Sequence, residues 1–296
     1  MRNAFARAFT AAANADERLR LIVADISPAG AMTEFRERHP DRFLNVGIAE
    51  QSMIGIAAGL AQAGLRPFCY TIATFALFRP FEFVRNDVCY QNVSVVIVGI
   101  GGGLCYSTLG ATHHAREDIA LAALLPNMQI IAPCDPLETE AATHWLIGQN
   151  APAYLRLGKA GEPELTANAP PWEFGEIRPL RFIPSNTCIL SYGPIMSRAL
   201  ALAERMHANV YDVHTLKPLD KIALENIVRY YAELIIIEES VPFLGPIVKA
   251  LAHDIERRCR ITTFALPDEF CHTYGTRDEL LDASGFAIDD MLERIK

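Results

Sequence analysis

One carboxylate in this sequence is placed where it could do chemistry. Glu50 follows residues 45–49 and begins a stretch of small and apolar residues that runs to Gly64, with no basic residue before Arg66. A carboxylate buried without a partner is costly, so such a group is usually hydrogen-bonded, protonated or engaged with a ligand. The dipole of a helix beginning at Glu50 could also stabilise it, and these few residues alone favour that simpler alternative.

Two further groups of side chains suit a planar or polar ligand. Phe75, Phe78 and Phe81 recur every third residue, which places them near one face if the segment is helical. Filling a core is an equally ordinary use of such residues. His113 and His114 lie in a predicted loop, where polar residues serve function more often than packing. No neighbouring carboxylate or cysteine gives them a convincing metal-ligand spacing.

The composition describes a globular protein with enough apolar material for real cores. Hydrophobic residues make up 51% of the 296 positions and charged residues 21%. The net charge of −8 is spread along the chain, so we expect no nucleic-acid partner. The seven cysteines form no C-x-x-C pair, which predicts a reduced, cytoplasmic protein without a zinc site. No apolar segment is long enough for a membrane span.

Strand and helix signals alternate along the chain. The run at residues 93–98 is continuously β-branched or apolar apart from Ser94, as in a strand covered on both faces. Alternation of this kind predicts a mostly parallel, doubly wound sheet. The predicted strands of the first half are 21–25, 43–46, 66–71, 93–98, 128–132 and 153–157, with helices beginning at Glu50 and at about 78–90 and 137–149.

A break in this periodicity separates two units. From residue 158 to residue 184, Pro, Gly and Glu accumulate, as in a linker. We therefore predict an α/β fold of two doubly wound, mostly parallel-sheet domains, 1–160 and 185–296, joined by a linker at 161–184. The second unit has predicted strands at 188–192, 209–213, 234–238 and 262–265, and helices at 196–207, 221–231 and 245–257.

Several motifs together resemble a known family. In order and rough spacing they are similar to the pyrimidine-binding and C-terminal domains of transketolases and 1-deoxyxylulose-5-phosphate synthases. The resemblance covers nearly the whole chain, and it implies a pyrimidine-binding domain at 1–160 and a transketolase C-terminal domain at 185–296. The motifs are residues 45–51, 74–81, 110–114, 125–128, 132–139 and 213–220.

The resemblance implies an enzyme that depends on thiamine diphosphate and transfers a two-carbon ketol unit between sugar-like substrates. Glu50 matches the family glutamate that contacts N1′ of the aminopyrimidine ring. This contact favours the imino tautomer, whose 4′ nitrogen takes the C2 proton of the thiazolium. Phe75, Phe78 and Phe81 match the aromatic positions around the pyrimidine, and Phe81 is the least certain match of the three.

Four other residues gain roles from the same resemblance. His113 matches a histidine that faces cofactor and substrate, so it is the candidate for proton transfer or hydroxyl recognition, with His114 second. Arg156 matches an arginine that binds substrate phosphate or hydroxyl groups, although an arginine at a strand end is equally often a surface charge. Asp25 matches a position at the subunit interface near the cofactor, and capping of the next element is nearly as good an explanation.

Two positions depart from the family pattern. A histidine and an aspartate are usual where this chain has Gly101 and Leu109. The aspartate recognises a donor hydroxyl, so an ordinary ketose phosphate is in question as the donor. The residues assigned to the carbanion chemistry are retained.

A Gly-Asp-Gly motif, which in the family holds the diphosphate through Mg²⁺, is missing from the sequence. We therefore expect the C-terminal half of a split transketolase, in which a separate N-terminal subunit with that motif supplies the Mg²⁺ ligands, most simply as α2β2. Within enzymes, a 1-deoxyxylulose-5-phosphate-synthase-like subunit or the β subunit of a 2-oxoacid dehydrogenase is the alternative. The paired histidines and residues 217–220 favour transketolase. A non-catalytic partner half is a further alternative.

Overall fold

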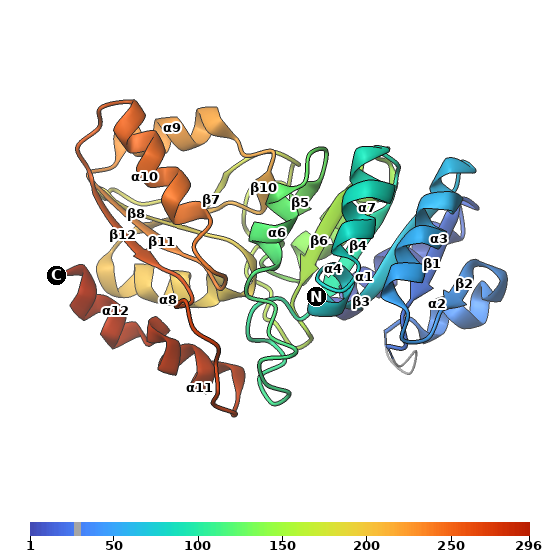
Figure 1. Ribbon diagram of the computed structural model, residues 1–296. Coiled ribbons are helices and arrows are strands. Elements are labelled where there is room, and N and C mark those ends of the chain that lie inside the picture. Colours follow the sequence, from blue (N-terminus) through green and yellow to red (C-terminus); the bar gives the residue numbers. More distant parts are fainter. Residues whose placement is uncertain (27–30) are drawn as a thin grey trace.

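Apolar runs of the first half become the inner strands of a seven-stranded sheet (Figure 1). The computed structural model describes residues 1–26 and 31–296. The strand order is β10-β5-β6-β4-β3-β1-β2, and every pair is parallel except β10 with β5. The bounds are β1 (Leu19–Val23), β2 (Phe43–Asn45), β3 (Arg66–Ile72), β4 (Val96–Ile100), β5 (Gln129–Ile131), β6 (Ala153–Leu157) and β10 (Thr215–Lys217).

Helices cover both faces of this sheet because successive strand side chains point to opposite sides. On β3, Phe68 and Tyr70 pack toward α1 and α7, whereas Cys69 packs toward α3, α4 and α6. The helices are α1 (Arg2–Ala13), α2 (Thr33–Arg38), η1 (Pro40–Arg42), α3 (Glu50–Gln62), α4 (Ala73–Leu77), α5 (Phe81–Phe83), η2 (Val84–Tyr90), α6 (Asp118–Leu124) and α7 (Pro136–Ile147). The helix predicted at 78–90 begins only after Pro80 and consists of α5 followed by the π-helix η2.

A second, five-stranded sheet follows in the order β12-β11-β8-β9-β7, parallel except at β7. Helices α8 and α12 pack on one face, and α9 and α10 on the other. The two sheets confirm the predicted α/β fold class. The bounds are β7 (Arg178–Arg181), β8 (Thr187–Ser191), η3 (Gly193–Ile195), α8 (Met196–Met206), β9 (Asn209–Asp212), α9 (Lys221–Tyr230), β11 (Glu233–Ile237), α10 (Leu244–Asp254), β12 (Arg260–Phe264), α11 (Arg277–Leu281), η4 (Asp282–Phe286) and α12 (Ile288–Ile295).

The segment predicted as a linker, 161–184, is anchored and partly regular. It contains β7, an edge strand that tolerates Pro179 because an edge position need not donate every backbone hydrogen bond. Asp135 holds the first part of this segment in place. Its Oδ2 accepts hydrogen bonds from the backbone N–H groups of Leu165 and Thr166, each at 2.8 Å. This Pro-rich and Gly-rich segment therefore connects the two sheets, and it is itself held by hydrogen bonds to the folded units.

The two sheets are joined by backbone hydrogen bonds. Strand β10 comes after β9 in the chain but pairs antiparallel with β5 of the first sheet. The N–H of Ala132 donates to the carbonyl of His214 at 2.8 Å, and that of Gly193 to the carbonyl of Ala132 at 3.1 Å. Lys217 Nζ donates to the carbonyls of Ala123 and Leu125 at 2.9 and 2.6 Å. The 217–220 motif thus fastens the second unit to α6.

Buried charges fill the same junction. Glu138 of α7 accepts from the Cys134 N–H at 2.6 Å and pairs with Arg178 of β7. Arg178 Nε lies 3.6 Å from Asp212 Oδ2, and both Glu138 and Asp212 are fully enclosed. Burial and then the neighbouring charge of Glu138 raise the pKa of Asp212 well above its ordinary value. A proton on Asp212 is thereby favoured above the pH at which an ordinary aspartate ionises, and it reduces the negative charge that faces Arg178.

We expect Asp212→Asn to change how stability depends on pH. Unfolding releases the Asp212 proton once the pH exceeds its unfolded pKa of about 4, so the free energy of unfolding declines by up to about 1.4 kcal/mol per pH unit above that value. Asparagine has no such proton, so the decline becomes shallower. Urea unfolding at several pH values between 4 and 8 measures the slope of the free energy of unfolding with pH. Asp289→Asn, with a side chain 84% exposed, is the control, and an unchanged slope in Asp212→Asn contradicts the assignment.

Candidate active site

The candidate site lies at the carboxyl edge of the first sheet, where parallel strands of an open α/β sheet present their ligand-binding loops. Glu50 follows β2, and Phe75 follows β3. His113 belongs to the loop after β4. Three of the predicted site residues thus follow strands of one sheet, with β4 next to β3 and β1 between β3 and β2.

Glu50 is the first residue of α3, and its side chain is only 4% exposed. Its Oε1 accepts a hydrogen bond from Arg79 Nη1 at 2.8 Å. The positive end of the α3 dipole adds to this compensation. The residues around Glu50 do not indicate Arg79, which comes 29 residues later in the turn between α4 and α5.

Arg79 also stacks on Phe75. Its guanidinium carbon lies 3.9 Å from the centre of the Phe75 ring, within the range of a cation–π contact. Phe75 belongs to α4, and Arg79 comes four residues later, the spacing at which side chains meet along a helix. That spacing is the signal by which sequence reasoning could have found Arg79.

His113 borders the same aromatic ring. Its imidazole meets Phe75 edge-on with the ring centres 5.1 Å apart, and its Nδ1 lies 2.9 Å from Thr112 Oγ1. Burial, and then the charge of Arg79, lower the pKa of His113 below its ordinary value. The imidazole is therefore neutral at pH 7 and available to accept a proton.

The departure from the family at position 101 has a packing explanation. Gly101 has φ +78°, in the left-handed region that favours glycine. A Cβ atom there would lie 2.2 Å from Tyr106 Cε2. The Tyr106 ring fills this space and lies 6.2 Å from His113, centre to centre. Leu109, at the other departure, is 49% exposed.

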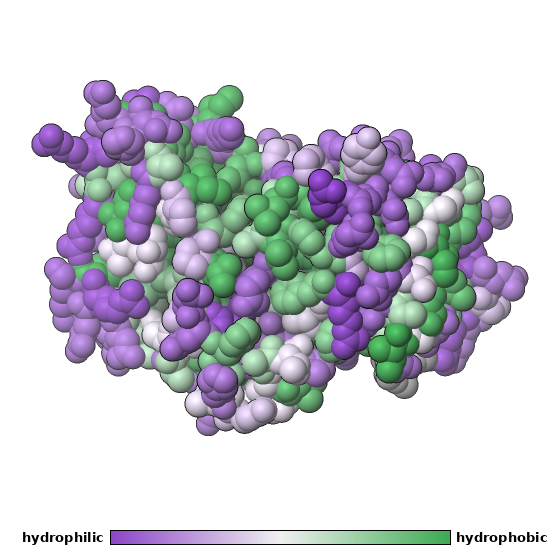
Figure 2. Space-filling view, viewed as in Figure 1, coloured by the Kyte–Doolittle hydropathy of each residue, from purple (hydrophilic) through white to green (hydrophobic). Residues whose placement is uncertain are grey.

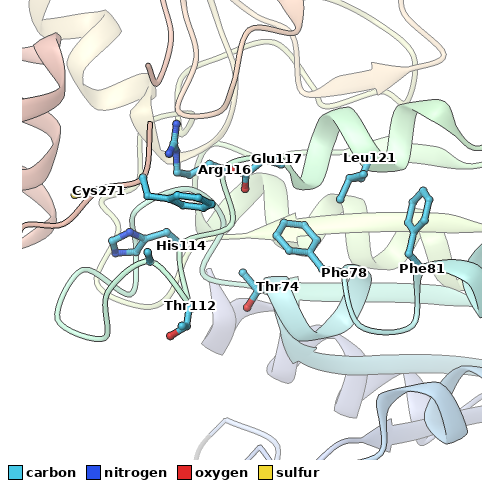
Figure 3. Close-up of a pocket in the computed structure, with 11 residues that line it drawn as sticks. Thr74, Phe78, Phe81, Thr112, His114, Arg116, Glu117, Leu121 and Cys271 are labelled. Carbon is cyan, nitrogen blue, oxygen red and sulfur yellow. The ribbon is translucent and has the colours of Figure 1, made fainter. Parts of the chain in front are cut away.

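A cavity of about 580 Å³ adjoins this cluster. Figure 3 shows Phe78, Leu121 and Phe81 along one part of it, and Thr112, His114 and Arg116 along another. Phe270 and Cys271 of the second unit complete the lining, and Arg116 holds their segment by donating to the carbonyls of Pro267 and Glu269. His114 is buried, and burial followed by the charge of Arg116 lowers its pKa.

Arg156 does not end at the surface, as an arginine free to bind substrate would. Its side chain is 1% exposed, and Nε donates to Asp118 Oδ2 at 2.8 Å. Nη2 donates to the carbonyls of Ala115 and Glu239 at 3.2 and 2.9 Å. These donors hold the loop before α6 against the second unit, and a contact between Arg156 and substrate stays a prediction.

Asp25 follows β1 and is exposed. Its φ of +45° lies in the left-handed region, and its N–H donates to Asn45 Oδ1 at 3.1 Å. Asn45 also accepts from the Gly47 N–H at 3.0 Å. Asp25 thus contacts the turn that leads from β2 toward Glu50, and its place at a subunit interface stays a prediction.

The site suits an aminopyrimidine, because a buried carboxylate and an aromatic face already hold a planar N–H donor there. A cation site is a different matter. Among the residues the structure describes, Cys134, Glu138 and Asp212 form the one group with ligand atoms close enough for a metal ion. They lie at the junction with Arg178, which competes with a cation for Glu138.

No helix among the described residues has the length and apolarity needed to cross a bilayer.

The sequence matches two known domains that account for both units. Residues 1–161 match the transketolase pyrimidine binding domain, and residues 178–291 match the transketolase C-terminal domain. The chain belongs to the transketolase family. The second match begins at β7, so it includes the strand found within the predicted linker.

Two kinds of relatives match most of this chain: transketolase-family proteins aligned over most of their length, and synthases aligned over about half of theirs. The transketolase family protein y4mN of Sinorhizobium fredii is 32% identical over 302 residues, which cover 99% of this chain and 87% of that protein. A subunit of the apulose-4-phosphate transketolase of Phocaeicola vulgatus is 32% identical, with 90% of this chain and 88% of that subunit covered. A 1-deoxy-D-xylulose-5-phosphate synthase of Nitratidesulfovibrio vulgaris is 33% identical over 96% of this chain, but the match spans only 46% of the synthase.

Solved structures share the architecture. A split-gene transketolase, described as an inactive β4 tetramer, superposes with a TM-score of 0.86 at 30% identity, covering 99% of this chain and 96% of that one. Transketolase from Campylobacter jejuni superposes with a TM-score of 0.78 at 17% identity, which shows the fold alone.

We expect Arg79→Gln to raise the pKa of His113 toward the ordinary value for histidine. The substitution removes the charge of Arg79, while burial continues to hold the pKa down. An NMR titration of the imidazole signals, assigned with a His113 variant, measures the change. Arg85→Gln removes an exposed arginine that contacts Asn86 and serves as the control. An unaltered titration in Arg79→Gln contradicts the arrangement of Arg79 and His113.

Proposed function

We propose that this chain is the pyrimidine-binding subunit of a thiamine-diphosphate-dependent transketolase that transfers a two-carbon ketol unit between sugar-like substrates. The observation that carries the proposal is the meeting of Glu50, Phe75 and His113 at one edge of the sheet. It combines a buried carboxylate, an aromatic face and a neutral imidazole. A core-filling role explains the phenylalanine but not the two polar groups beside it.

Thiamine diphosphate supplies the carbanion chemistry when bound. Glu50 provides the acceptor for the pyrimidine N1′, and its burial makes this charged hydrogen bond stronger than the same contact in water. The face of Phe75 orients the ring, while Phe78 and Phe81 form the apolar wall of the adjoining cavity. These residues fix the direction in which the pyrimidine presents its amino group.

His113 and His114 serve the substrate in this proposal. His113 is neutral and half-buried beside Phe75, so it can accept a proton or a hydroxyl hydrogen bond. His114 lines the cavity one residue further along. Arg156 acts indirectly as a positioning residue, because it holds the Ala115 carbonyl at the end of the loop that carries both histidines.

A second polypeptide completes the site. We propose an N-terminal transketolase subunit with a Gly-Asp-Gly motif, which holds the diphosphate through Mg²⁺, in an α2β2 assembly. The apulose-4-phosphate transketolase subunit and the split-gene transketolase match this chain over 88% and 96% of their own lengths. Figure 2 shows apolar side chains gathered at the α3 end of the molecule, where Leu44, Ile48 and Ile56 are 42%, 74% and 39% exposed. An exposed apolar surface of this kind suits a contact between subunits.

Two alternatives have support of their own. The synthase of Nitratidesulfovibrio vulgaris matches 96% of this chain, which favours a pyruvate-using acyloin former; a 2-oxoacid dehydrogenase β-type subunit would also use an oxoacid. Pyruvate decarboxylation without ketose use would favour that class. A non-catalytic partner half is the second alternative, supported by the departures at Gly101 and Leu109. The retention of Glu50 and Phe75 argues against it.

Calorimetric titration tests the shared site. Thiamine diphosphate with Mg²⁺ is added to this chain alone, to the candidate partner alone, and to their mixture. We expect tight binding only in the mixture, because this chain offers the pyrimidine contacts and the partner the diphosphate contacts. Tight binding by this chain alone would contradict the proposed division of the site. Absence of binding in all three would contradict the cofactor assignment, once the partner is shown to associate.

We expect Glu50→Gln to lower turnover of the reconstituted pair by about 10²- to 10⁴-fold, because the amide removes the charged acceptor that the proton transfer requires. Initial rates with ketose donors measure the loss, and circular dichroism checks the fold. Glu34→Gln is the matched control, since Glu34 is a surface residue paired with Arg38. Unchanged turnover in Glu50→Gln would support the non-catalytic alternative.

A further inference from the structure

Arg79 makes the two contacts that the proposed function assigns to the pyrimidine ring. Its Nη1 donates to Glu50 Oε1 at 2.8 Å, and its guanidinium carbon lies 3.9 Å from the centre of the Phe75 ring. The second distance is that of two groups in van der Waals contact, so no other planar group fits between them.

We propose that Arg79 is an internal ligand of the pyrimidine site, held by Glu50 and Phe75 in the free chain and displaced when an aminopyrimidine binds. A guanidinium is planar, donates N–H groups to a carboxylate and stacks on an aromatic face. An aminopyrimidine that donates from a ring nitrogen has the same recognition chemistry. This inference rests on the proposed function, since it concerns the same site.

The geometry makes displacement practicable. The Arg79 side chain is 43% exposed, whereas that of Glu50 is 4% exposed. Arg79 lies between the end of α4 at Leu77 and the start of α5 at Phe81, so its long side chain can turn into solvent without unpacking a helix. Ion pairs with one partner so exposed contribute modestly, which limits the competition to about a tenfold effect on affinity.

Arg79 also has a use in the free chain. Without it, the Glu50 carboxylate would be left buried with only the α3 dipole as compensation, and an unpaired buried charge is costly. The same contact therefore has two opposite consequences. It stabilises the free chain, and it lowers the affinity of the assembled site for the cofactor.

The opposite effects of Arg79 on the stability of the free chain and on cofactor affinity provide the test. We expect Arg79→Gln to unfold at a lower urea concentration as a free chain, and to bind thiamine diphosphate several-fold, up to about tenfold, more tightly in the reconstituted pair. Calorimetry with Mg²⁺ present measures the affinity. Arg79→Lys keeps the charge but loses the planar fork, so an intermediate affinity is expected. Arg85→Gln, an exposed arginine of η2, is the control for charge alone and leaves both quantities unchanged.

A partner-free measurement separates this inference from the proposed function. NMR follows the His113 and Phe75 signals of the free chain as 4-amino-2-methylpyrimidine is added. We expect saturable shifts in Arg79→Gln at lower ligand concentrations than in the wild type. Equal or weaker binding by Arg79→Gln, in the pair or in the free chain, overturns the internal-ligand proposal while leaving the proposed function in place. If no wild-type or variant pair binds the cofactor and no free chain binds the pyrimidine, both proposals fail.

Discussion

The candidate site depends on the burial of one carboxylate. Glu50 lies where apolar α3 begins, and a charge in that position requires both the helix dipole and a donor. Arg79 supplies the donor, and the aromatic face of Phe75 keeps its guanidinium in place. Phe75 in turn borders His113. The polar groups of the site are thus linked through a single ring, so a change at Glu50 or Arg79 alters the surroundings of the imidazole as well.

The second domain determines where the histidine loop lies. Arg156 joins Asp118 at the start of α6 to the carbonyls of Ala115 and Glu239, and so ties the end of the loop to the second sheet. The Glu239 carboxylate accepts from the Leu104 N–H at 2.8 Å, near the beginning of the same loop. Both ends of the loop are therefore held by buried charged hydrogen bonds across the domain junction. This gives the C-terminal domain a structural part in a site whose candidate chemical groups all come from the first domain.

Local sequence patterns predicted most of the strands and helices. They did not predict pairings between residues far apart in the chain. Continuous apolar runs such as 93–98 predicted inner strands, and the fold class is confirmed. Strand β10 was missed because three residues carry no periodicity, and its pairing with β5 crosses the domain boundary. The sequence indicated Glu50, Phe75 and His113, which the structure brings together. It did not indicate Arg79 or the buried partners of Arg156, because the partners of a charged side chain depend on tertiary contacts rather than on neighbours in the chain.

Gly101 and Tyr106 lie on the His113 side of the site, away from the contact between Glu50 and Arg79. Tyr106 occupies the space that a side chain at 101 would need, so glycine and tyrosine are linked through packing. The tyrosine ring lies beside His113, and Lys159 Nζ is 5.2 Å from its centre. An aromatic ring that also contacts a lysine thus borders the histidine where the family pattern has a polar side chain. Arg79 and Glu50, in contrast, meet over the face of Phe75. The residues that would select a donor therefore pack against different neighbours from the carboxylate that would activate the cofactor.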